Sequence, residues 1–232
     1  MRSFIFNIFF IAGTFFYALL SVIFSFVPGR KLMMWSLRRY TRVMTWAMRH
    51  IAGIDVSVTG HENVPQDGAV IIAAKHQSYG DGIVMFSQFF DLSFVTGDHL
   101  ERFLFLKRIL AKMNAVVIDS CGGVDSRRKM AETSAIIREQ GRRILIYPEG
   151  HLSQIGTHHT YRKGVYHLYK DFGCPVIPVA TNLGQRWNQS DWQKHPGSAT
   201  LEFLEPIMPG LNKDEFMELL QNRIETRSLE LL

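Results

Sequence analysis

The amino-terminal end of the chain is a long apolar stretch. Residues 3–29 contain no charged side chain and are rich in Phe, Ile, Leu and Val. A helix of about 20 apolar residues spans the hydrocarbon layer of a bilayer, so this segment is long enough to cross it with some tilt. The pattern predicts an uncleaved membrane helix.

Two other interpretations of this segment stay open. A cleaved signal peptide would have a shorter apolar region and a cleavage site with small residues, which residues 24–28 (FSFVP) match poorly. The remaining alternative is a buried helix of the protein core.

The pattern changes after residue 30, where Trp and Met residues alternate with arginines. The apolar members are Leu32, Trp35, Met44, Trp46 and Met48, and the basic ones are Arg38, Arg39, Arg42 and Arg49. A helix over residues 31–51 could lie in the membrane interface, with its apolar face toward acyl chains and its arginines toward phosphates. It could also pack against the core of the domain that follows, and its different faces allow both.

From residue 54 onward, short apolar runs alternate with longer helical patterns, separated by turn residues. Strands are expected at residues 55–59, 69–74, 93–96, 115–118, 143–147, 176–181 and 200–203, and helices at 83–90, 100–113, 127–139, 161–171 and 213–232. Helical crossovers predict an α/β fold: a mostly parallel or mixed central sheet with helices on both faces, preceded by the amino-terminal hydrophobic membrane helix. We expect an anchor with its basic helix over residues 1–53 and one folded domain over residues 54–232.

Composition and charge favour a membrane as the partner. The 232 residues are 47% hydrophobic and 20% charged, which suits a folded chain rather than a disordered one. The net charge of +5 favours anionic partners, either nucleic acid or a phospholipid surface. The apolar amino-terminal segment argues against a soluble nucleic-acid binder.

Basic residues are concentrated after the apolar segment. They are Arg30, Lys31, Arg38, Arg39, Arg42 and Arg49, whereas Arg2 and the amino terminus precede it. The positive-inside bias predicts a protein of the cytoplasmic membrane whose folded domain faces the cytoplasm. A re-entrant segment, with both ends cytoplasmic, is the alternative. Cys121 and Cys174 are expected to be free thiols in that reducing compartment.

A histidine and an aspartate follow the second apolar strand, where residues 75–81 read KHQSYGD. Acyl transfer to a hydroxyl needs a base for its proton; imidazole titrates in the useful range, and a carboxylate can orient it. On a regular helix His76 and Asp81 would diverge by roughly 140°. A turn must therefore bring them together, and Gly80, in a loop before the next helix, is expected to supply it.

The spacing of this pair is weak evidence by itself. His50 and Asp55 stand equally far apart, but His50 lies in the basic segment next to the membrane rather than at the end of a buried strand. A structural or incidental role is the alternative for His76.

A second block ends another apolar strand. Residues 143–150 read RILIYPEG, so a carboxylate, Glu149, and a glycine, Gly150, follow the strand. The glycine would let the backbone approach a ligand closely. The alternative is a strand-ending turn in which Glu149 is solvated or caps a helix.

In this order, the blocks resemble the glycerolipid acyltransferase family, which includes 1-acyl-sn-glycerol-3-phosphate acyltransferase. They are His76-x4-Asp81, Tyr147-Pro148-Glu149-Gly150 and Val176-Ile177-Pro178-Val179, and the similarity covers roughly residues 58–203. The resemblance implies acyl transfer from acyl-CoA or acyl-carrier protein to a lysolipid hydroxyl in phospholipid biosynthesis, without metal, cofactor or acyl-enzyme intermediate. It makes His76 the general base and Asp81 its partner, and places the block around Glu149 and Gly150 in the acceptor site.

The chain departs from this family at two positions. The family usually has arginines where this chain has Ser120 and Leu152, so two cations expected near an acceptor phosphate are missing. The candidate substitutes are Arg127, Arg128, Arg162 and Lys163, and Lys163 is the favoured one. Each could instead be a solvated surface charge. Alternatively, the acceptor carries no simple phosphomonoester, as in a lyso-ornithine lipid, or the chain is a non-catalytic relative that binds anionic lipid.

Other familiar chemistries find no support in the sequence. It contains neither the G-x-S-x-G elbow nor a phosphate-binding G-x4-G-K-[ST] loop. His151, His158 and His159 have no acidic or thiol ligands at suitable spacing, so we expect no metal. The sequence does not indicate an oligomeric state.

Overall fold

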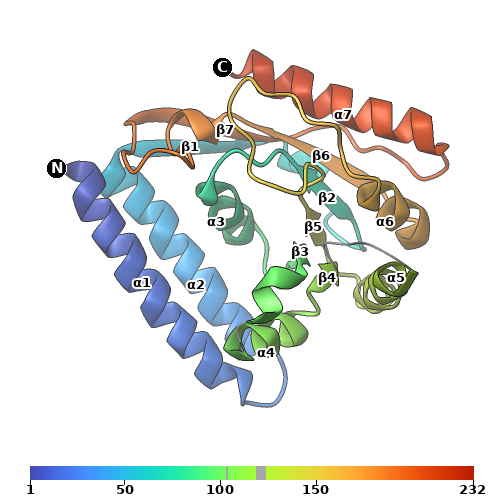
Figure 1. Cartoon of the computed structure of the whole chain (residues 1–232), viewed down its shortest axis with the longest axis horizontal. Helices are drawn as coiled ribbons and strands as arrows, with labels where there is room; N and C mark the ends of the chain where they lie inside the picture. Colours follow the sequence, from blue (N-terminus) through green and yellow to red (C-terminus); the bar gives the residue numbers. More distant parts are fainter. Residues whose placement is uncertain (103, 119–123) are drawn as a thin grey trace.

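A seven-stranded sheet forms the centre of the molecule (Figure 1). The computed structural model describes residues 1–102, 104–118 and 124–232. The strands are β1 (Ile54–Thr59), β2 (Ile71–Ala74), β3 (Ser93–Gly97), β4 (Val116–Ile118), β5 (Ile144–Ile146), β6 (Val176–Thr181) and β7 (Gly197–Phe203). Their order is β1-β7-β6-β2-β5-β3-β4, and the neighbours are parallel except for the antiparallel pair of β6 and β7. The predicted α/β fold with a mixed sheet is confirmed.

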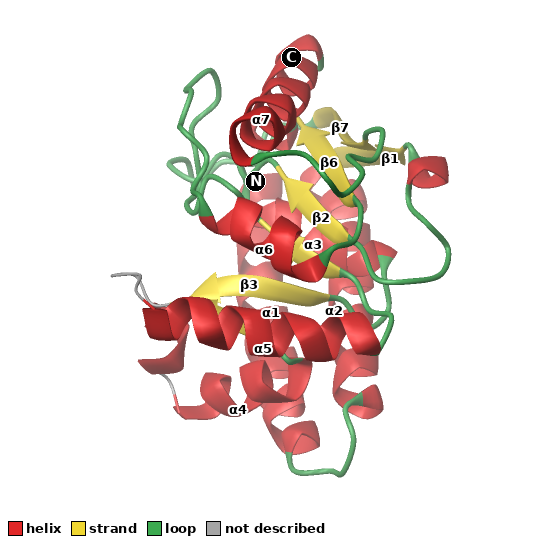
Figure 2. Cartoon of the chain, turned by 90° about the vertical axis from the view of Figure 1, so that its right-hand side faces the viewer, coloured by secondary structure: helices red, strands yellow, loops and turns green. Residues whose placement is uncertain are grey.

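Helices cover both faces of this sheet. They are α1 (Arg2–Ser25), α2 (Lys31–Ala47), α3 (Tyr79–Gln88), α4 (Leu104–Met113), α5 (Val124–Glu139), α6 (Gly164–Phe172) and α7 (Lys213–Glu230). Ile72 points into the core beneath α2 and α3, whereas its neighbour Ile71 points into the core beneath α5, α6 and α7. Successive strand side chains face opposite sides, so a strand covered on both faces is apolar throughout. In Figure 2 the strands lie between α5 and α6 on the near side and α1 and α2 on the far side.

The apolar segment forms α1, which runs antiparallel to α2 along one side of the domain (Figure 1). Phe6 is fully buried and Phe10 packs beside it, and each ring meets the indole of Trp187 edge-on at 5.2 Å. The helix has 24 residues and a mean hydropathy of 2.2 over its most apolar part, of which only 11% is buried. It is thus long and apolar enough to cross a membrane, and it is not a core helix.

Helix α2 buries one face against the domain and exposes the other, as the sequence pattern suggested. Met44 and Ala47 are fully buried, whereas Trp35 and Trp46 are 54% and 53% exposed. A π-helical turn at Met48–Ala52 links α2 to β1. Core packing is therefore confirmed for one face, and the interfacial role of the other face stays a prediction.

Several predicted boundaries differ from the structure, and three of these differences have a local cause. Helix α3 begins at Tyr79 rather than at residue 83, because a cap described below starts it earlier. Strand β7 begins at Gly197 rather than at residue 200, because its first residues pair with β1. Helix α6 begins at Gly164 rather than at residue 161, because the preceding chain is tied to the site: the backbone N–H of Arg162 donates to Pro148 O at 2.8 Å.

Candidate active site

The two blocks singled out in the sequence meet at one edge of the sheet. Strands β2 and β5 are parallel neighbours, with Ala73 opposite Ile146. The residues that follow these two strands therefore leave the sheet side by side. In such sheets ligands bind beyond the carboxyl ends of the strands. This register brings His76 and Tyr147 together.

The first turn of α3 fixes the carboxylate of Asp81. Ser78 is the N-cap in extended conformation, and its Oγ accepts a hydrogen bond from Gly80 N at 3.0 Å. Asp81, three residues later, accepts hydrogen bonds at Oδ2 from the backbone N–H groups of Gln77 at 2.7 Å and Ser78 at 2.8 Å. This is a capping box, so the aspartate is immobilised by the helix start itself.

The imidazole of His76 completes that arrangement. Its Nδ1 lies 3.1 Å from Asp81 Oδ2, and its side chain is 20% exposed. Because a carboxylate accepts, Nδ1 carries the proton and Nε2 keeps its lone pair. The result is an oriented imidazole whose Nε2, in the neutral ring, can accept a proton.

The turn that unites the pair does not come from Gly80, and the prediction that it would was wrong. Gly80 lies inside α3, and the chain turns earlier, before the extended Ser78. A side chain at position 80 would have its Cβ 2.9 Å from Leu183 Cδ2 and 3.1 Å from Trp187 Cε3. The glycine is needed because the helix packs tightly against Leu183 and Trp187.

The ring of Tyr147 lies flat on the imidazole. The ring centroids of His76 and Tyr147 are 3.8 Å apart, and the planes differ by 14°. Burial, and then the charge of Asp81, raise the pKa of Tyr147 well above its usual value. The phenol therefore stays neutral and cannot act as a base. The stacked phenol ring restricts tilting of the imidazole.

Glu149 lies beneath the loop that carries Lys75, His76 and Gln77, with no solvent exposure of its side chain. Its Oε1 accepts a hydrogen bond from His76 N at 3.0 Å, and its Oε2 is 2.9 Å from Lys75 Nζ. Ser153 binds Glu149 Oε2 through Oγ and donates to His76 O from N at 2.8 Å. The structure thus brings Glu149 to His76, with its carboxylate bonded to protein groups. An acceptor-binding role for this glutamate stays a prediction.

Gly150 and Arg162 form the exposed border of the site. Gly150 has φ 73°, and a Cβ there would come 2.4 Å from Arg162 Nε. Arg162 is exposed, and its Nε lies 3.4 Å from Glu149 O. Lys163, also exposed, is the N-cap residue of α6. The guanidinium of Arg162 therefore lies against Gly150. Lys163, the substitute cation favoured from the sequence, is the next residue in the chain.

The remaining candidate cations stand on α5, and one of them lies outside the described side chains. Arg128 is exposed on α5, with Nε 3.8 Å from Glu132. The side chain of Arg127 and the whole of Ser120 and Cys121 lie outside the described residues. Cys174 is a free thiol, as expected. Within residues 1–102, 104–118 and 124–232, no group of three or more His, Cys, Asp or Glu side chains is arranged to hold a metal. The expectation that no metal is bound stays a prediction.

The sequence profile of the Acyltransferase family matches residues 55–182, more than half of the chain. This chain belongs to that family. It is 29% identical to a 1-acyl-sn-glycerol-3-phosphate acyltransferase of Pseudomonas aeruginosa over 199 residues, which are 85% of this chain and 77% of that protein. A Saccharomyces cerevisiae protein of the same name is 26% identical over 90% of this chain and 69% of its own length. The protein is an acyltransferase, and the resemblance stated from the sequence is confirmed.

A solved structure has the same fold as this acyltransferase. It is the 1-acyl-sn-glycerophosphate acyltransferase PlsC from Thermotoga maritima, which superposes with a TM-score of 0.78. The match covers 100% of this chain and 98% of that one, at 22% identity. The whole chain, α1 and α2 included, therefore follows a known architecture.

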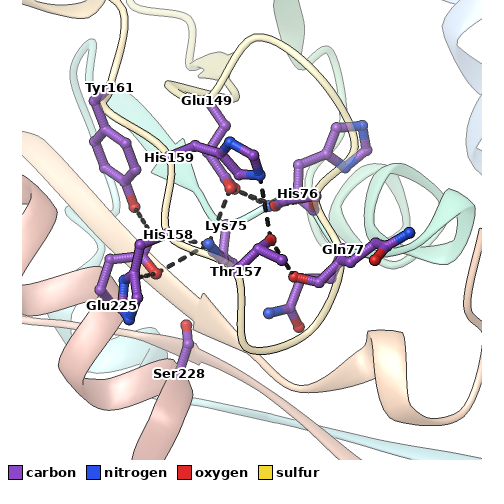
Figure 3. A network of polar contacts seen from close by, with 12 residues as sticks. Lys75, His76, Gln77, Glu149, Thr157, His158, His159, Tyr161, Glu225 and Ser228 are labelled. Atoms are coloured by element: carbon purple, nitrogen blue, oxygen red, sulfur yellow. Dashed lines mark hydrogen bonds and ion pairs between the residues drawn. The ribbon is translucent and has the colours of Figure 1, made fainter.

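The acyltransferase site also contains residues that the sequence analysis missed. They are Lys75, Ser153, Tyr161 and Glu225, and all four side chains are buried. Figure 3 shows Lys75, Tyr161 and Glu225. Lys75 follows an apolar strand, which was a signal that its charge is buried. A buried charge must be paired, so the sequence could have predicted a partner carboxylate for this lysine. Glu225 gave no local signal, since it belongs to α7 and lies 150 residues after Lys75 in the chain.

Proposed function

We propose that this acyltransferase moves a fatty acyl chain from acyl-CoA or acyl-carrier protein to the free hydroxyl of a lysolipid, with 1-acyl-sn-glycerol-3-phosphate as the favoured acceptor. The observation that carries the proposal is the oriented imidazole of His76, held by Asp81 and stacked on Tyr147. The names of the Pseudomonas and yeast relatives support the choice of acceptor.

The proposed reaction is a direct transfer. Nε2 of His76 takes the proton of the acceptor hydroxyl as that oxygen attacks the thioester carbonyl. The carbon–sulfur bond then breaks, and the thiol leaves with the proton that the imidazolium returns. Asp81, 3.1 Å from Nδ1, stabilises the imidazolium in between. The products are the acylated lipid and the free thiol, and no acyl-enzyme is formed.

One experiment tests this function. Membranes containing the full chain are incubated with one labelled thioester and a panel of lysolipids, and the acylated product is identified by mass. We expect the protein to convert 1-acyl-sn-glycerol-3-phosphate (lysophosphatidate) to phosphatidate. A protein that acylates lyso-ornithine lipid instead would keep the chemistry but refute the acceptor. A protein inert toward every lysolipid would favour the non-catalytic lipid-binding relative.

Arg162 is the cation that we propose for the acceptor phosphate. Its guanidinium lies against Gly150 at the exposed border of the site. Guanidinium groups bind phosphates through two parallel, charge-assisted hydrogen bonds. This replaces the earlier preference for Lys163.

Replacing Arg162 by glutamine should raise KM for lysophosphatidate by about tenfold or more, because hydrogen bonds to charged groups contribute roughly 1.5–3 kcal/mol. The measurement is initial rate against acceptor concentration at a saturating thioester. Arg223→Gln, an arginine of α7 whose Nη1 donates to Glu205 O at 2.8 Å, is the matched control and should change KM little. Equal effects of the two substitutions would refute the assignment.

We propose that α1 and α2 attach the protein to the cytoplasmic membrane as a re-entrant hairpin. The start of α1 is bonded to the domain: Ser3 Oγ accepts from Lys194 N at 3.0 Å, and Asn7 Nδ2 donates to Trp192 O at 2.9 Å. A helix that spans the bilayer would have to break these contacts. The exposed apolar residues of α1 would instead enter the cytoplasmic leaflet, beside the exposed arginines of α2.

A reporter fused to the amino terminus should therefore be accessible from the cytoplasmic side, where the domain lies. Accessibility of reporters at the two ends of the chain in sealed and opened membrane vesicles checks this. The carboxyl-terminal reporter serves as the control for the domain. An amino-terminal reporter on the opposite side would show that α1 spans the membrane.

A further inference from the structure

A buried network of charges joins the carboxyl-terminal helix α7 to the catalytic loop (Figure 3). Lys75 Nζ lies 2.9 Å from Glu149 Oε2, 2.8 Å from Glu225 Oε1 and 3.0 Å from Glu225 Oε2. The side chains of Lys75 and Glu149 are at most 1% exposed, and that of Glu225 is 10% exposed. One ammonium is thus held between two carboxylates from distant parts of the chain.

The surroundings of Glu225 hold its carboxylate in one place. Tyr161 Oη donates to Glu225 Oε1 at 2.8 Å. Burial, and then the charge of Glu225, raise the pKa of Tyr161, so this phenol remains a donor. His158 Nδ1 lies 3.7 Å from Glu225 Oε2, and a small cavity borders both residues. The carboxylate of Glu225 therefore lies beside the exposed imidazole of His158.

A continuous path leads from this carboxylate to the catalytic histidine. Glu225 binds Lys75, Lys75 binds Glu149, and Glu149 Oε1 accepts the backbone N–H of His76 at 3.0 Å. Each link is a hydrogen bond to a charged group, the stronger class of hydrogen bond. The position of the His76 main chain therefore depends on a carboxylate of α7.

Helix α7 does not need these charges in order to dock. Phe216, Leu220 and Ile224 are fully buried in the core beneath it. Burying a lysine and two glutamates costs solvation that well-packed apolar side chains would not. The network is thus better explained by a need to hold the His76 main chain in position than by a contribution to the stability of the fold.

We propose that Glu225 is a positioning residue for acyl transfer. It fixes Lys75, and through Lys75 and Glu149 it fixes the backbone that presents the His76 imidazole. The inference rests on the proposed function, in which His76 is the general base. It assigns to the carboxyl-terminal helix a part in the reaction that neither sequence block reveals.

Glu225→Gln in the full chain tests this role. We expect kcat to fall about tenfold or more, with KM for thioester and acceptor within about twofold of wild type, because in this proposal Glu225 acts through Lys75 and Glu149 rather than on the substrates. Glu230→Gln, an exposed position of the same helix paired with Arg227, is the matched control and should leave kcat unchanged. Loss of folded protein with normal kcat per folded molecule would overturn the proposal, since it would mean a structural role alone.

A second pair of variants tests the coupling between the charges. Lys75→Met leaves two buried carboxylates without their cation and should lower kcat further. Adding Glu225→Gln to Lys75→Met removes one of these carboxylates and should recover part of the lost activity. Independent effects of the two substitutions would contradict the path from Glu225 to His76. If Lys75→Met does not fold, recovery of folded protein in the double variant reports the same coupling.

A nuclear magnetic resonance measurement separates this inference from the proposed function. The Nδ1–H proton of His76, shared with Asp81, should give a resonance that is absent from His76→Gln. We expect it to be sharp in wild type and Glu230→Gln and broadened or shifted in Glu225→Gln. Wild-type protein that acylates no lysolipid would refute the function. An unchanged resonance and unchanged kcat in Glu225→Gln would refute the positioning role.

Discussion

His76→Ala should lower acyl transfer by about a thousandfold or more, because a positioned general base typically contributes 10²–10⁴-fold. The protein should remain folded and membrane-associated, since the cap formed by Asp81 with the N–H groups of Gln77 and Ser78 does not use the imidazole. The measurement is transfer from a labelled thioester in membranes with equal amounts of variant and wild-type protein.

The chain provides a matched control for this substitution. His50 stands at the same spacing from Asp55, but its ring packs beside Trp46, with centroids 5.1 Å apart, and Asp55 is paired with Arg49. His50→Ala should leave the rate of the chemical step unchanged. A His76→Ala protein with near-normal activity would exclude the imidazole as the base.

Asp81→Asn should lower kcat by about a hundredfold or more while largely preserving the fold. The amide oxygen can still accept from the two backbone N–H groups, so the start of α3 survives. The negative charge that orients and stabilises the imidazolium is lost, and the amide can hold the wrong tautomer. In the serine-protease triad the corresponding change costs about 10⁴-fold.

Ser78→Ala separates capping from catalysis. It removes the side-chain bond to Gly80 N and should cost about 1 kcal/mol of unfolding free energy. Its effect on kcat should be far smaller than that of Asp81→Asn. Thermal or denaturant unfolding measured beside transfer rates distinguishes the two losses. Equal losses of stability and activity in both variants would mean that Asp81 acts as a cap alone.

The central strands β2, β5 and β6 were predictable because they are buried on both faces. Strand β6, Val176–Thr181, was predicted to the residue, since a buried parallel strand is a continuous apolar run ended by turn residues. The approach of His76 to Glu149 was also predictable, because both follow such strands and parallel neighbours end at the same edge.

The start of α3 could have been found in the sequence and was not. Ser78 followed by Asp81 is a capping-box pattern. Read as a helix start, it would have placed Asp81 in the first turn of α3 rather than in a loop. The glycine at position 80 was misinterpreted because its small size fits the packing of Leu183 and Trp187, which is a tertiary constraint.

Other features could not have come from local pattern. The contact of Arg162 with Gly150 depends on how the loop after β5 folds back, and the pairing of Lys75 with Glu225 depends on where α7 docks. The chain between Gly150 and Arg162 has no regular structure. Lys75 and Glu225 are 150 residues apart in the sequence. Periodicity reports which face of an element is buried, not which charged groups meet there.

The pH dependence of kcat/KM tests the central claim most directly, because a general base must be unprotonated. The wild-type value should be constant near neutral pH and fall by about tenfold per pH unit on the acid side, as the imidazole of His76 takes up a proton. The residual activity of His76→Ala should lack this acid limb. An acid limb that persists unchanged in His76→Ala would show that another group titrates, and that His76 is not the base.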